Sequence, residues 1–303
     1  PTPLDTTYLT NSGTEAIEGA LKLAKRVTGR YEVVSAKNAY HGNTMGAMSV
    51  MGYEERKRDY RPLIPGTSFI EFNSNEELHK ITTKTAAVIL ETIQGSAGFI
   101  LPTEGYLSSV KKKCKDVGAL LILDEIQTGI GRTGKLLASW HEDIIPDIVI
   151  LGKALSAGFY PVSGVLTSKE IMNVMQVGSH GSTFGGNPLA GVVAKASIKY
   201  TLDYKLSENA ENLGKIFRDG LEEIKSRRKI IKGIRGKGLL NAIILDCDVK
   251  SKIPWNICLS MKDNGLLAKP TQGNKIRFAP PLVINRRQIK KALKIIDLSL
   301  SEF

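Results

Sequence analysis

The sequence predicts an α/β fold, with a large domain built on a mainly parallel sheet with helices on both faces and a smaller α+β domain at the C-terminal end. Three observations lead to this prediction. Strand-like and helix-like segments alternate up to about residue 200, the pattern changes near residue 205, and 303 residues of which 42% are hydrophobic can bury a substantial core. We therefore expect a large domain over residues 1–204 and a small domain over residues 205–303.

Five short apolar runs predict buried strands in the large domain. The runs are "YEVVS", "AAVILE", "ALLILD", "DIVILG" and "VSGVL". Each run is too short for a helix, and a nearly continuous apolar run is typical of a strand in a sheet that is covered on both faces. Residues 13–27 and 105–118 instead place apolar side chains at spacings of three and four, which predicts helices. Strands that alternate with helices favour a parallel sheet.

The C-terminal third of the sequence has a different pattern. Residues 206–226 predict a long amphipathic helix, and a last helix begins near Arg287. The segments between these helices are "GLLNAIIL", "WNICLSMKDNG", "LLAKP" and "KIRFAPPL". Because they mix short strand-like runs with one helical stretch, they predict the small α+β domain.

Composition narrows the cellular setting. No 18-residue apolar run lacks a charge, and the first residues have neither the basic nor the apolar region of a signal peptide. The three cysteines, Cys114, Cys247 and Cys258, form no C-x-x-C pair and are predicted to be reduced and partly buried. We therefore expect a cytoplasmic protein, or one from an organelle matrix.

The formal net charge of +12 raises the question of a nucleic-acid partner. The basic clusters, however, lie on or beside helical patterns and have no interleaved aromatic residues for base stacking. We interpret them as solvated helix faces, and we expect neither a nucleic-acid nor a membrane partner. A non-catalytic basic binding protein stays open as an alternative.

Motifs for metals, nucleotides and serine hydrolysis are missing or weak. The four histidines share no metal-ligand spacing and there is no G-x-S-x-G, so we expect neither a metal site nor a serine nucleophile. Gly129–Leu136 fits G-x-G-x-x-G and nearly fits a P-loop, but Leu136 replaces the metal-binding hydroxyl and no clean amphipathic helix follows. We interpret this segment as a glycine-rich turn.

The strongest chemical signal begins with two charged residues at strand ends. Asp124 ends one buried strand, where open α/β sheets place their sites, and Lys153 ends the next. A lysine desolvated there would have a lowered pKa and a neutral amine, which suits an imine with the aldehyde of pyridoxal phosphate. Asp124 would keep the ring nitrogen of this cofactor protonated.

A phosphate cradle would complete such a site. "NSGTEA" places Ser12, Gly13 and Thr14 at a helix N-terminus, where free backbone N–H groups and the helix dipole favour an anion. "HGSTFGGNP" offers a further hydroxyl, that of Thr183. Each feature alone has an ordinary explanation, such as a surface lysine whose stem covers apolar atoms or a helix-capping aspartate. The hypothesis rests on their joint occurrence.

Several motifs resemble the class III, fold-type-I aminotransferases that depend on pyridoxal phosphate. They are "NSGTEAIEGALKLAK", "ILETIQG", "LDEIQTGIGRTGK", "LGKALSAG" and "HGSTFGGNPLA". The resemblance runs from residue 5 to the C-terminus. The segments "RGKGLLNAI", "NGLLAKPTQG" and "IRFAPPLVI" resemble the ornithine aminotransferase branch, whereas "AYHGNTMGAMSVMGYEERK" is more similar to an acetylornithine or ω-amino-acid branch.

The resemblance implies roles for the residues that match its motifs. Lys153 would hold the cofactor as an imine and move the substrate proton, and Asp124 would pair with the pyridinium nitrogen. Gln127 would contact the ring hydroxyl, and Tyr40 would stack on the ring. The backbone of Gly13 and Thr14 would hold the phosphate.

The resemblance also implies a homodimer and a carboxylate-binding residue. Thr183 would reach the phosphate from the other subunit. Arg277 would clamp the carboxylate of 2-oxoglutarate or glutamate, a role that suits its bidentate fork.

The implied reaction moves the δ-amino group of L-ornithine to 2-oxoglutarate, giving glutamate semialdehyde and glutamate. Two positions differ from the family pattern: Asn43 stands where many members have an arginine, and Ser96 where ornithine aminotransferases have a glutamate. Acetylornithine or another ω-amino acid therefore stays open as the donor, and so does a decarboxylase or racemase with the same cofactor. Family members also carry a segment ahead of "NSGTEA" that this sequence is expected to lack.

Overall fold

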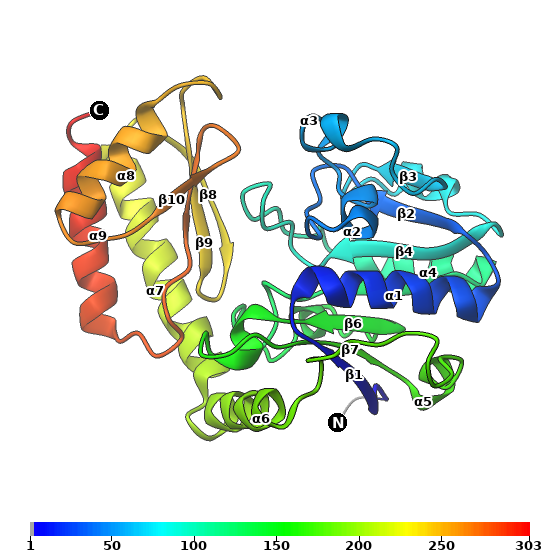
Figure 1. Cartoon of the computed structure of the whole chain (residues 1–303). Coiled ribbons are helices and arrows are strands. Elements are labelled where there is room, and N and C mark those ends of the chain that lie inside the picture. Colours follow the sequence, from blue (N-terminus) through cyan, green and yellow to red (C-terminus); the bar gives the residue numbers. More distant parts are fainter. Residues whose placement is uncertain (1–2) are drawn as a thin grey trace. The chain divides into compact units, whose positions relative to one another are not determined.

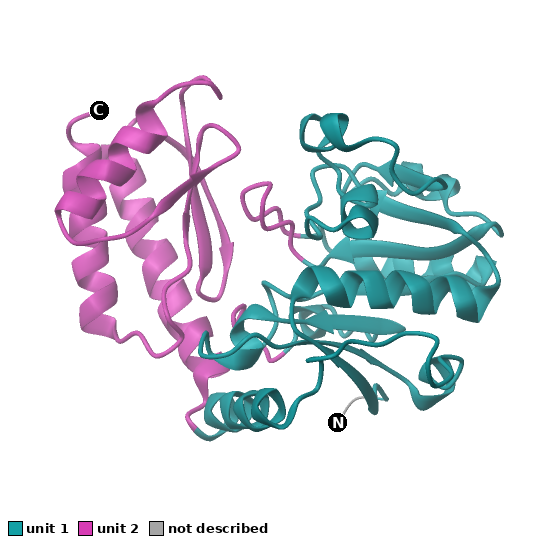
Figure 2. Cartoon of the chain, viewed as in Figure 1, with its two compact units in different colours: residues 1–92, 102–130, 137–203 teal, residues 93–101, 131–136, 204–303 magenta. Residues whose placement is uncertain are grey.

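The chain divides into two compact units, which Figure 2 colours separately. The computed structural model describes residues 3–303. The first unit comprises Pro1–Thr92, Pro102–Ile130 and Leu137–Asp203. The second comprises Ile93–Leu101, Gly131–Leu136 and Tyr204–Phe303. Two short segments are thus grouped with the C-terminal part, and a domain division at residues 204 and 205 stays a prediction.

A seven-stranded mixed sheet forms the centre of the first unit (Figure 1), with the order β1-β7-β6-β5-β4-β2-β3. The strands are β1 (Thr6–Thr10), β2 (Glu32–Ala36), β3 (Thr67–Ile70), β4 (Thr85–Glu91), β5 (Leu120–Asp124), β6 (Ile148–Leu151) and β7 (Ser163–Thr167). The neighbouring strands β3, β2, β4, β5 and β6 are paired in parallel, in that spatial order. β7 is antiparallel to both β6 and β1. The five expected strands and the mainly parallel α/β class are confirmed.

The sequence analysis missed β1 and β3, which lie at the two edges of the sheet. Most of their side chains are only partly buried, and threonine and serine contribute much of both strands. An edge strand packs less apolar surface than a central one, so neither segment forms the continuous apolar run that marks the inner strands.

Helices cover both faces of this sheet (Figure 1). The first unit contains α1 (Gly13–Thr28), α2 (Met45–Ser49), α3 (Glu54–Lys57), α4 (Tyr106–Val117), α5 (Lys169–Met172) and α6 (Pro188–Asp203), with 3₁₀ turns η1 (Arg58–Tyr60), η2 (Glu76–Lys80), η3 (Ala138–His141) and η4 (Lys153–Ser156). Along β5, Ile122 packs in the core cluster with α1, whereas Leu121 and Leu123 pack in the cluster with α4. This alternation follows the two-residue period of a strand.

A four-stranded antiparallel sheet organises the second unit, in the order β10-β11-β9-β8. Its elements are α7 (Leu206–Arg227), β8 (Ile231–Lys237), β9 (Leu240–Leu245), α8 (Ile253–Asp263), β10 (Lys269–Thr271), β11 (Lys275–Phe278) and α9 (Arg286–Leu300). Ile243 and Leu245 of β9 pack with the three helices, whereas Leu240 and Ala242 pack with the segment 93–101. The expected mixture of helices and strands in this part is confirmed.

The segment 131–136 is held within the second unit by half-buried Arg132, whose backbone oxygen accepts from the N–H of Leu239 at 3.1 Å. The Arg132 guanidinium donates hydrogen bonds to the carbonyl oxygens of Leu239 (3.2 Å) and Pro280 (2.5 Å). Burial lowers its pKa to about 10. Gly129–Leu136 forms a turn followed only by η3, so the glycine-rich turn expected from the sequence is confirmed.

At Gly214, α7 approaches the turn after β8 closely. A Cβ atom at Gly214 would lie 1.9 Å from the carbonyl oxygen of Gly238, which is backbone and cannot swing away. We expect Gly214→Ala to lower the free energy of unfolding by about 3 kcal/mol, because the turn after β8 must move. Chemical denaturation followed by circular dichroism measures the change.

The matched control is Gly191→Ala in α6, where a Cβ would meet no atom within 4 Å. This substitution should raise the free energy of unfolding by about 0.5–1 kcal/mol, because alanine loses less conformational entropy than glycine in a helix. Similar effects of the two substitutions would contradict the close approach at Gly214.

Candidate active site

A buried carboxylate lies at the carboxyl end of β5. Asp124 is 6% exposed, and its Oδ2 atom lies 2.8 Å from Nδ1 of His41. The backbone N–H of Ile126 donates to its Oδ1 atom at 3.0 Å. An ionised carboxylate only accepts hydrogen bonds, so Nδ1 of His41 carries the proton in this pair. The partners satisfy a charge that would otherwise be costly to bury.

Lys153 follows the neighbouring strand. β5 and β6 are parallel, and Asp124 pairs in register with Ile150, three residues before Lys153. Lys153 begins the 3₁₀ turn η4 with a φ of 41°, in the left-handed region that is strained for a residue with a side chain. The backbone therefore makes a sharp turn at Lys153, at the same edge of the sheet as Asp124.

The expectation that Lys153 is desolvated is wrong for the single chain. Its side chain is exposed, although the strand before it is fully buried. The reason is that the chain leaves the sheet after Leu151. The apolar side chains that pack on β6 therefore do not extend to Lys153. The amine stands at the open edge of the sheet.

The N-terminus of α1 has the form expected of an anion cradle. Ser12 caps the helix, with its hydroxyl oxygen accepting from the backbone N–H of Glu15 at 3.4 Å. The first N–H groups of a helix have no helical acceptors, and here they belong to Gly13 and Thr14. The Thr14 hydroxyl lies 2.8 Å from that of Thr44 and accepts from the Thr44 backbone N–H at 3.2 Å.

Close backbone packing brings these pieces to one edge of the sheet. A Cβ atom at Gly13 would lie 2.6 Å from Ile126, and one at Gly152 would lie 3.3 Å from the same side chain. The Ile126 side chain therefore contacts both the start of α1 and Gly152, the residue before Lys153. These two parts of the backbone lie about one side chain apart. A Cβ at Gly42 would lie 2.4 Å from the Thr14 hydroxyl, so the loop that carries His41 packs directly against the N-terminus of α1.

The remaining predicted cofactor residues lie around this edge. Tyr40 is half-buried beside His41, and its backbone N–H donates to Glu91 at 3.0 Å. Gln127 is half-buried in the turn after Asp124. Thr183 is exposed, and the neighbouring Ser182 hydroxyl accepts from the side-chain amide of Asn11, just before α1, at 2.9 Å.

Arg277 belongs to the second unit, on β11. It is half-buried, donates to the carbonyl oxygen of Gly95 at 3.3 Å, and has its guanidinium carbon 5.7 Å from the centre of the Phe99 ring. The backbone oxygen of nearby Ser96 accepts from the Thr271 hydroxyl at 2.9 Å. The guanidinium is thus held against the segment 93–101.

Three supporting residues escaped the sequence analysis. His41 pairs with Asp124; Glu18 accepts from the backbone N–H groups of Gly46 (2.8 Å) and Ala47 (3.1 Å). Glu125 is fully buried and accepts from two backbone N–H groups of η3, and burial raises its pKa. A signal was present for Glu125, because a second carboxylate directly after a buried strand needs partners.

The assembled edge can bind an anion, hold a protonated ring nitrogen and present a primary amine. Nε2 of His41 is buried and has no partner among residues 3–303, and such atoms are usually satisfied by a bound polar group or water. The residues therefore fit pyridoxal phosphate. Within the same residues, no group of three or more His, Cys, Asp and Glu side chains could hold a metal ion.

Comparisons with known proteins point to one family. The family model described as aminotransferase class-III matches residues 1–300. An ornithine aminotransferase from Emericella nidulans is 45% identical over 96% of this chain and 68% of its own length.

Two solved structures are similar in fold and sequence. An ornithine aminotransferase from Toxoplasma gondii, crystallised with partial occupancy of pyridoxal phosphate, has a TM-score of 0.92 at 40% identity, over 98% of this chain and 72% of that one. An acetylornithine aminotransferase from Elizabethkingia anophelis has a TM-score of 0.86 at 45% identity, over 99% of this chain and 75% of that one. This chain belongs to the class-III aminotransferase family.

Proposed function

We propose that the chain is a pyridoxal-phosphate-dependent transaminase that moves the δ-amino group of L-ornithine to 2-oxoglutarate, giving glutamate semialdehyde and glutamate. The observation that carries this proposal is the meeting of Asp124, Lys153 and the start of α1 at one edge of the sheet. The ornithine aminotransferases of Emericella nidulans and Toxoplasma gondii support the choice of donor.

Each residue at this edge has a proposed task. Lys153 would hold the cofactor through its amine and would carry the proton to and from the substrate carbon. Asp124, oriented by His41, would pair with the ring nitrogen and keep it protonated. The cofactor, when bound, supplies a ring that accepts the electron pair released from the substrate.

The other proposed cofactor contacts rest on the match to the family's motifs and on the start of α1. The hydroxyl of Ser12 and the backbone N–H groups of Gly13 and Thr14 hold the phosphate at the positive end of the helix dipole. Gln127 would contact the ring hydroxyl, and Tyr40 would stack on the ring.

Arg277 is the proposed carboxylate clamp for 2-oxoglutarate and glutamate. Its guanidinium is half-buried and already oriented by Gly95 and Phe99, so little side-chain freedom is lost when a carboxylate binds. A planar guanidinium with two parallel donors matches the geometry of a carboxylate.

The amino donor has a specific alternative. Asn43 and Ser96 differ from the ornithine pattern, and the acetylornithine aminotransferase of Elizabethkingia anophelis is as similar in sequence as the ornithine enzymes are. Acetylornithine or another ω-amino acid is therefore the second candidate. A non-catalytic basic binding protein would leave the buried Asp124–His41 pair without a purpose.

We also propose a homodimer. Large apolar side chains are exposed along α6 and the segment before it, where an interface would cover them: Phe184 (69%), Leu189 (51%), Val192 (66%) and Leu202 (55%). Thr183 lies in the same stretch and would reach the phosphate of the partner subunit.

A cytoplasmic or organelle-matrix location suits the cysteines. Cys114, Cys247 and Cys258 form no disulfide, as expected in a reducing compartment. Among residues 3–303, no helix is long and apolar enough to cross a bilayer.

A donor screen tests the reaction. Reconstituted protein is incubated with 2-oxoglutarate and either ornithine, acetylornithine, lysine or 4-aminobutyrate, and glutamate is measured. We expect the largest kcat/KM with ornithine, together with glutamate semialdehyde. A larger kcat/KM with acetylornithine would make acetylornithine the donor in place of ornithine. Release of carbon dioxide or racemised substrate without glutamate would overturn the transaminase assignment.

Lys153→Ala should abolish covalent attachment of the cofactor. After borohydride reduction, mass spectrometry should find the mass of the reduced cofactor on the wild-type chain and none on the variant, because Lys153 is the residue proposed to hold the cofactor through its amine. Lys199→Ala, which removes an exposed lysine paired with Asp203 on α6, is the matched control and should keep the adduct. An adduct on the Lys153 variant would contradict the assignment.

Asp124→Asn should keep the covalent adduct but lower kcat by about 10²–10³-fold, since an amide cannot hold the ring nitrogen protonated. His41→Ala should lower kcat less, because it removes the partner that orients Asp124 and leaves the carboxylate in place. Steady-state kinetics at saturating ornithine measure both. A larger loss for His41→Ala than for Asp124→Asn would contradict these roles.

A further inference from the structure

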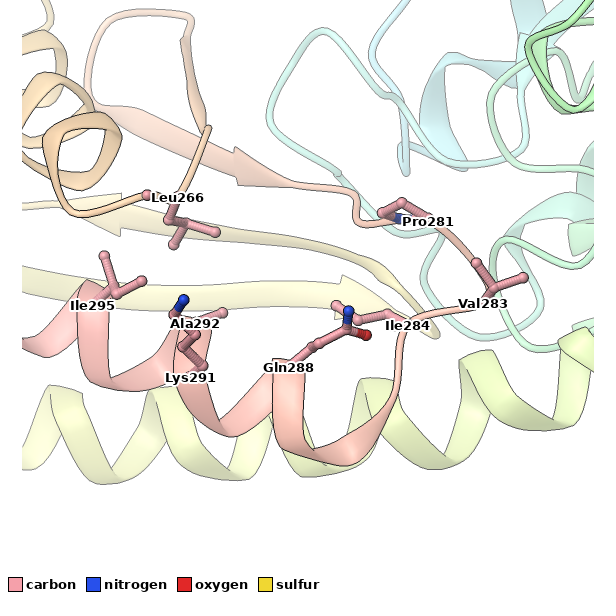
Figure 3. A pocket seen from close by; sticks show the side chains of 9 residues that line it. Leu266, Pro281, Val283, Ile284, Gln288, Lys291, Ala292 and Ile295 are labelled. Carbon is pink, nitrogen blue, oxygen red and sulfur yellow. The ribbon is translucent and has the colours of Figure 1, made fainter.

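An apolar groove lies in the second unit beside α9 (Figure 3). Its volume is about 290 Å³. The walls come from the turn after α8, the connection from β11 to α9, and α9 itself; the apolar residues are Leu266, Pro281, Val283, Ile284, Ala292 and Ile295. Figure 3 shows Leu266 facing Ile295 and Ala292 across this space. The groove is thus lined mainly by carbon.

One wall is held in place from α7. The side-chain amide of Asn209 donates to the carbonyl oxygens of Leu282 (2.7 Å) and Ile284 (3.1 Å). These bonds fix the connection that carries Val283, which is 58% exposed. The groove is therefore a shaped part of the fold, with an apolar surface left open to solvent.

Two polar side chains of α9 stand at the edge of the groove. Gln288 and Lys291 line it, and together with Arg287 they also line a second hollow on the outer side of the helix. The Gln288 side-chain oxygen accepts from the backbone N–H of Asn285 in a capping box. Its amide nitrogen stays available as a donor, and so does the Lys291 ammonium.

The exposed face of α9 carries an uncompensated cluster of cations, which we call the α9 cation row. It consists of Arg286, Arg287, Lys290, Lys291 and Lys294. All five are exposed, and within residues 3–303 none forms an ion pair. The nearest acidic residue of the helix, Asp297, is engaged by Arg227 and Arg228 at 3.0 and 2.8 Å.

The placement of this row opposes helix stability. The first turn of α9 contains no acidic residue, so two arginines stand at the positive end of the helix dipole. Arg287 and Lys291 are also four residues apart, and like charges at that spacing repel. A bound anion would relieve both penalties.

The charge of the whole chain is concentrated in the same part. Residues 204–303 contain 21 Lys and Arg against 10 Asp and Glu, whereas residues 1–203 contain 21 against 20. The formal net charge of +12 thus comes almost entirely from the C-terminal hundred residues. An apolar groove bordered by unpaired cations in a strongly positive field is complementary to a molecule with an apolar body and an anionic head.

We propose that this groove binds a small amphipathic carboxylate, with its apolar body among Leu266, Ile284 and Ile295 and its head at Lys291 and Arg287. A cavity of about 150 Å³ holds benzene, so this groove accommodates an aliphatic body of roughly ten carbon atoms. The site consists of residues with no proposed role in transamination, and it is independent of the proposed function.

Isothermal titration of the full chain with decanoate tests the site. We expect saturable binding to one site, at least tenfold weaker binding of the neutral 1-decanol, and no binding of acetate, which has the head without the body. Equal affinity for decanoate and decanol, or no decanoate binding at millimolar concentrations, would overturn the proposal.

Two substitutions locate the ligand. Lys291→Gln should weaken decanoate binding about tenfold, as the loss of a charge-assisted hydrogen bond predicts. Ala292→Leu should abolish binding by filling the groove. The matched control is Lys215→Gln, an exposed lysine of α7 that should bind decanoate like the wild type. Thermal melting confirms that each variant is folded.

A second arm separates a free carboxylate from a membrane surface. Vesicles of phosphatidylglycerol are mixed with the chain and sedimented. Binding to vesicles without binding of monomeric decanoate would show that the cation row serves a lipid surface, and this result would overturn the proposal. Unchanged decanoate affinity in Lys291→Gln or Ala292→Leu would do the same.

Discussion

The candidate site depends on one buried carboxylate. Asp124 is placed by a central strand with a parallel neighbour on each side, so its position is fixed by the ladder of β4, β5 and β6. Burying the charge at this place requires partners, and the structure supplies the ring of His41 and the backbone of Ile126. The loop that carries His41 is thereby tied to the end of β5, 83 residues further along the chain. A displaced Asp124 would release this loop and the cradle on which it presses.

Glycine makes the rest of the site possible. Gly13, Gly42 and Gly152 each sit where a side chain would strike a neighbour, at Ile126, Thr14 and Ser163 respectively. Because these positions lack Cβ atoms, the start of α1, the His41 loop and the chain before Lys153 approach each other closely. Glu18 and Glu125 then hold the loops around the edge through backbone N–H groups, which costs no further space at the site.

The two units differ in charge as well as in architecture. The first unit is built on the mixed sheet and contains the candidate cofactor residues Asp124 and Lys153, while the C-terminal hundred residues contain nearly all of the net positive charge. Part of that charge has a structural partner, as in the Arg227 and Arg228 pairs with Asp297. The α9 cation row has none within residues 3–303, and it borders an apolar groove. The proposed carboxylate site depends on this difference between paired and unpaired cations.

The sequence by itself determined the central strands and the main helices, and it singled out the residues proposed to carry the chemistry. Apolar runs and periodic spacing are local properties, so β2, β4 to β7, α1, α4 and α7 could be predicted from them. Asp124 and Lys153 stood out because a charge directly after a buried strand is unusual. The proximity of these two residues also followed, since neighbouring parallel strands end at the same edge.

Only the tertiary structure decided how these residues are supported. The edge strands β1 and β3 have polar sequences, and their pairing is specified by the strands beside them. The His41–Asp124 pair and the Arg132 anchor join residues that are far apart in sequence, and no local pattern reveals such contacts. The exposure of Lys153 had the same origin. Burial of a side chain depends on which other segments pack against it. β6 ends at Leu151, and Lys153 lies beyond the side chains that bury this strand.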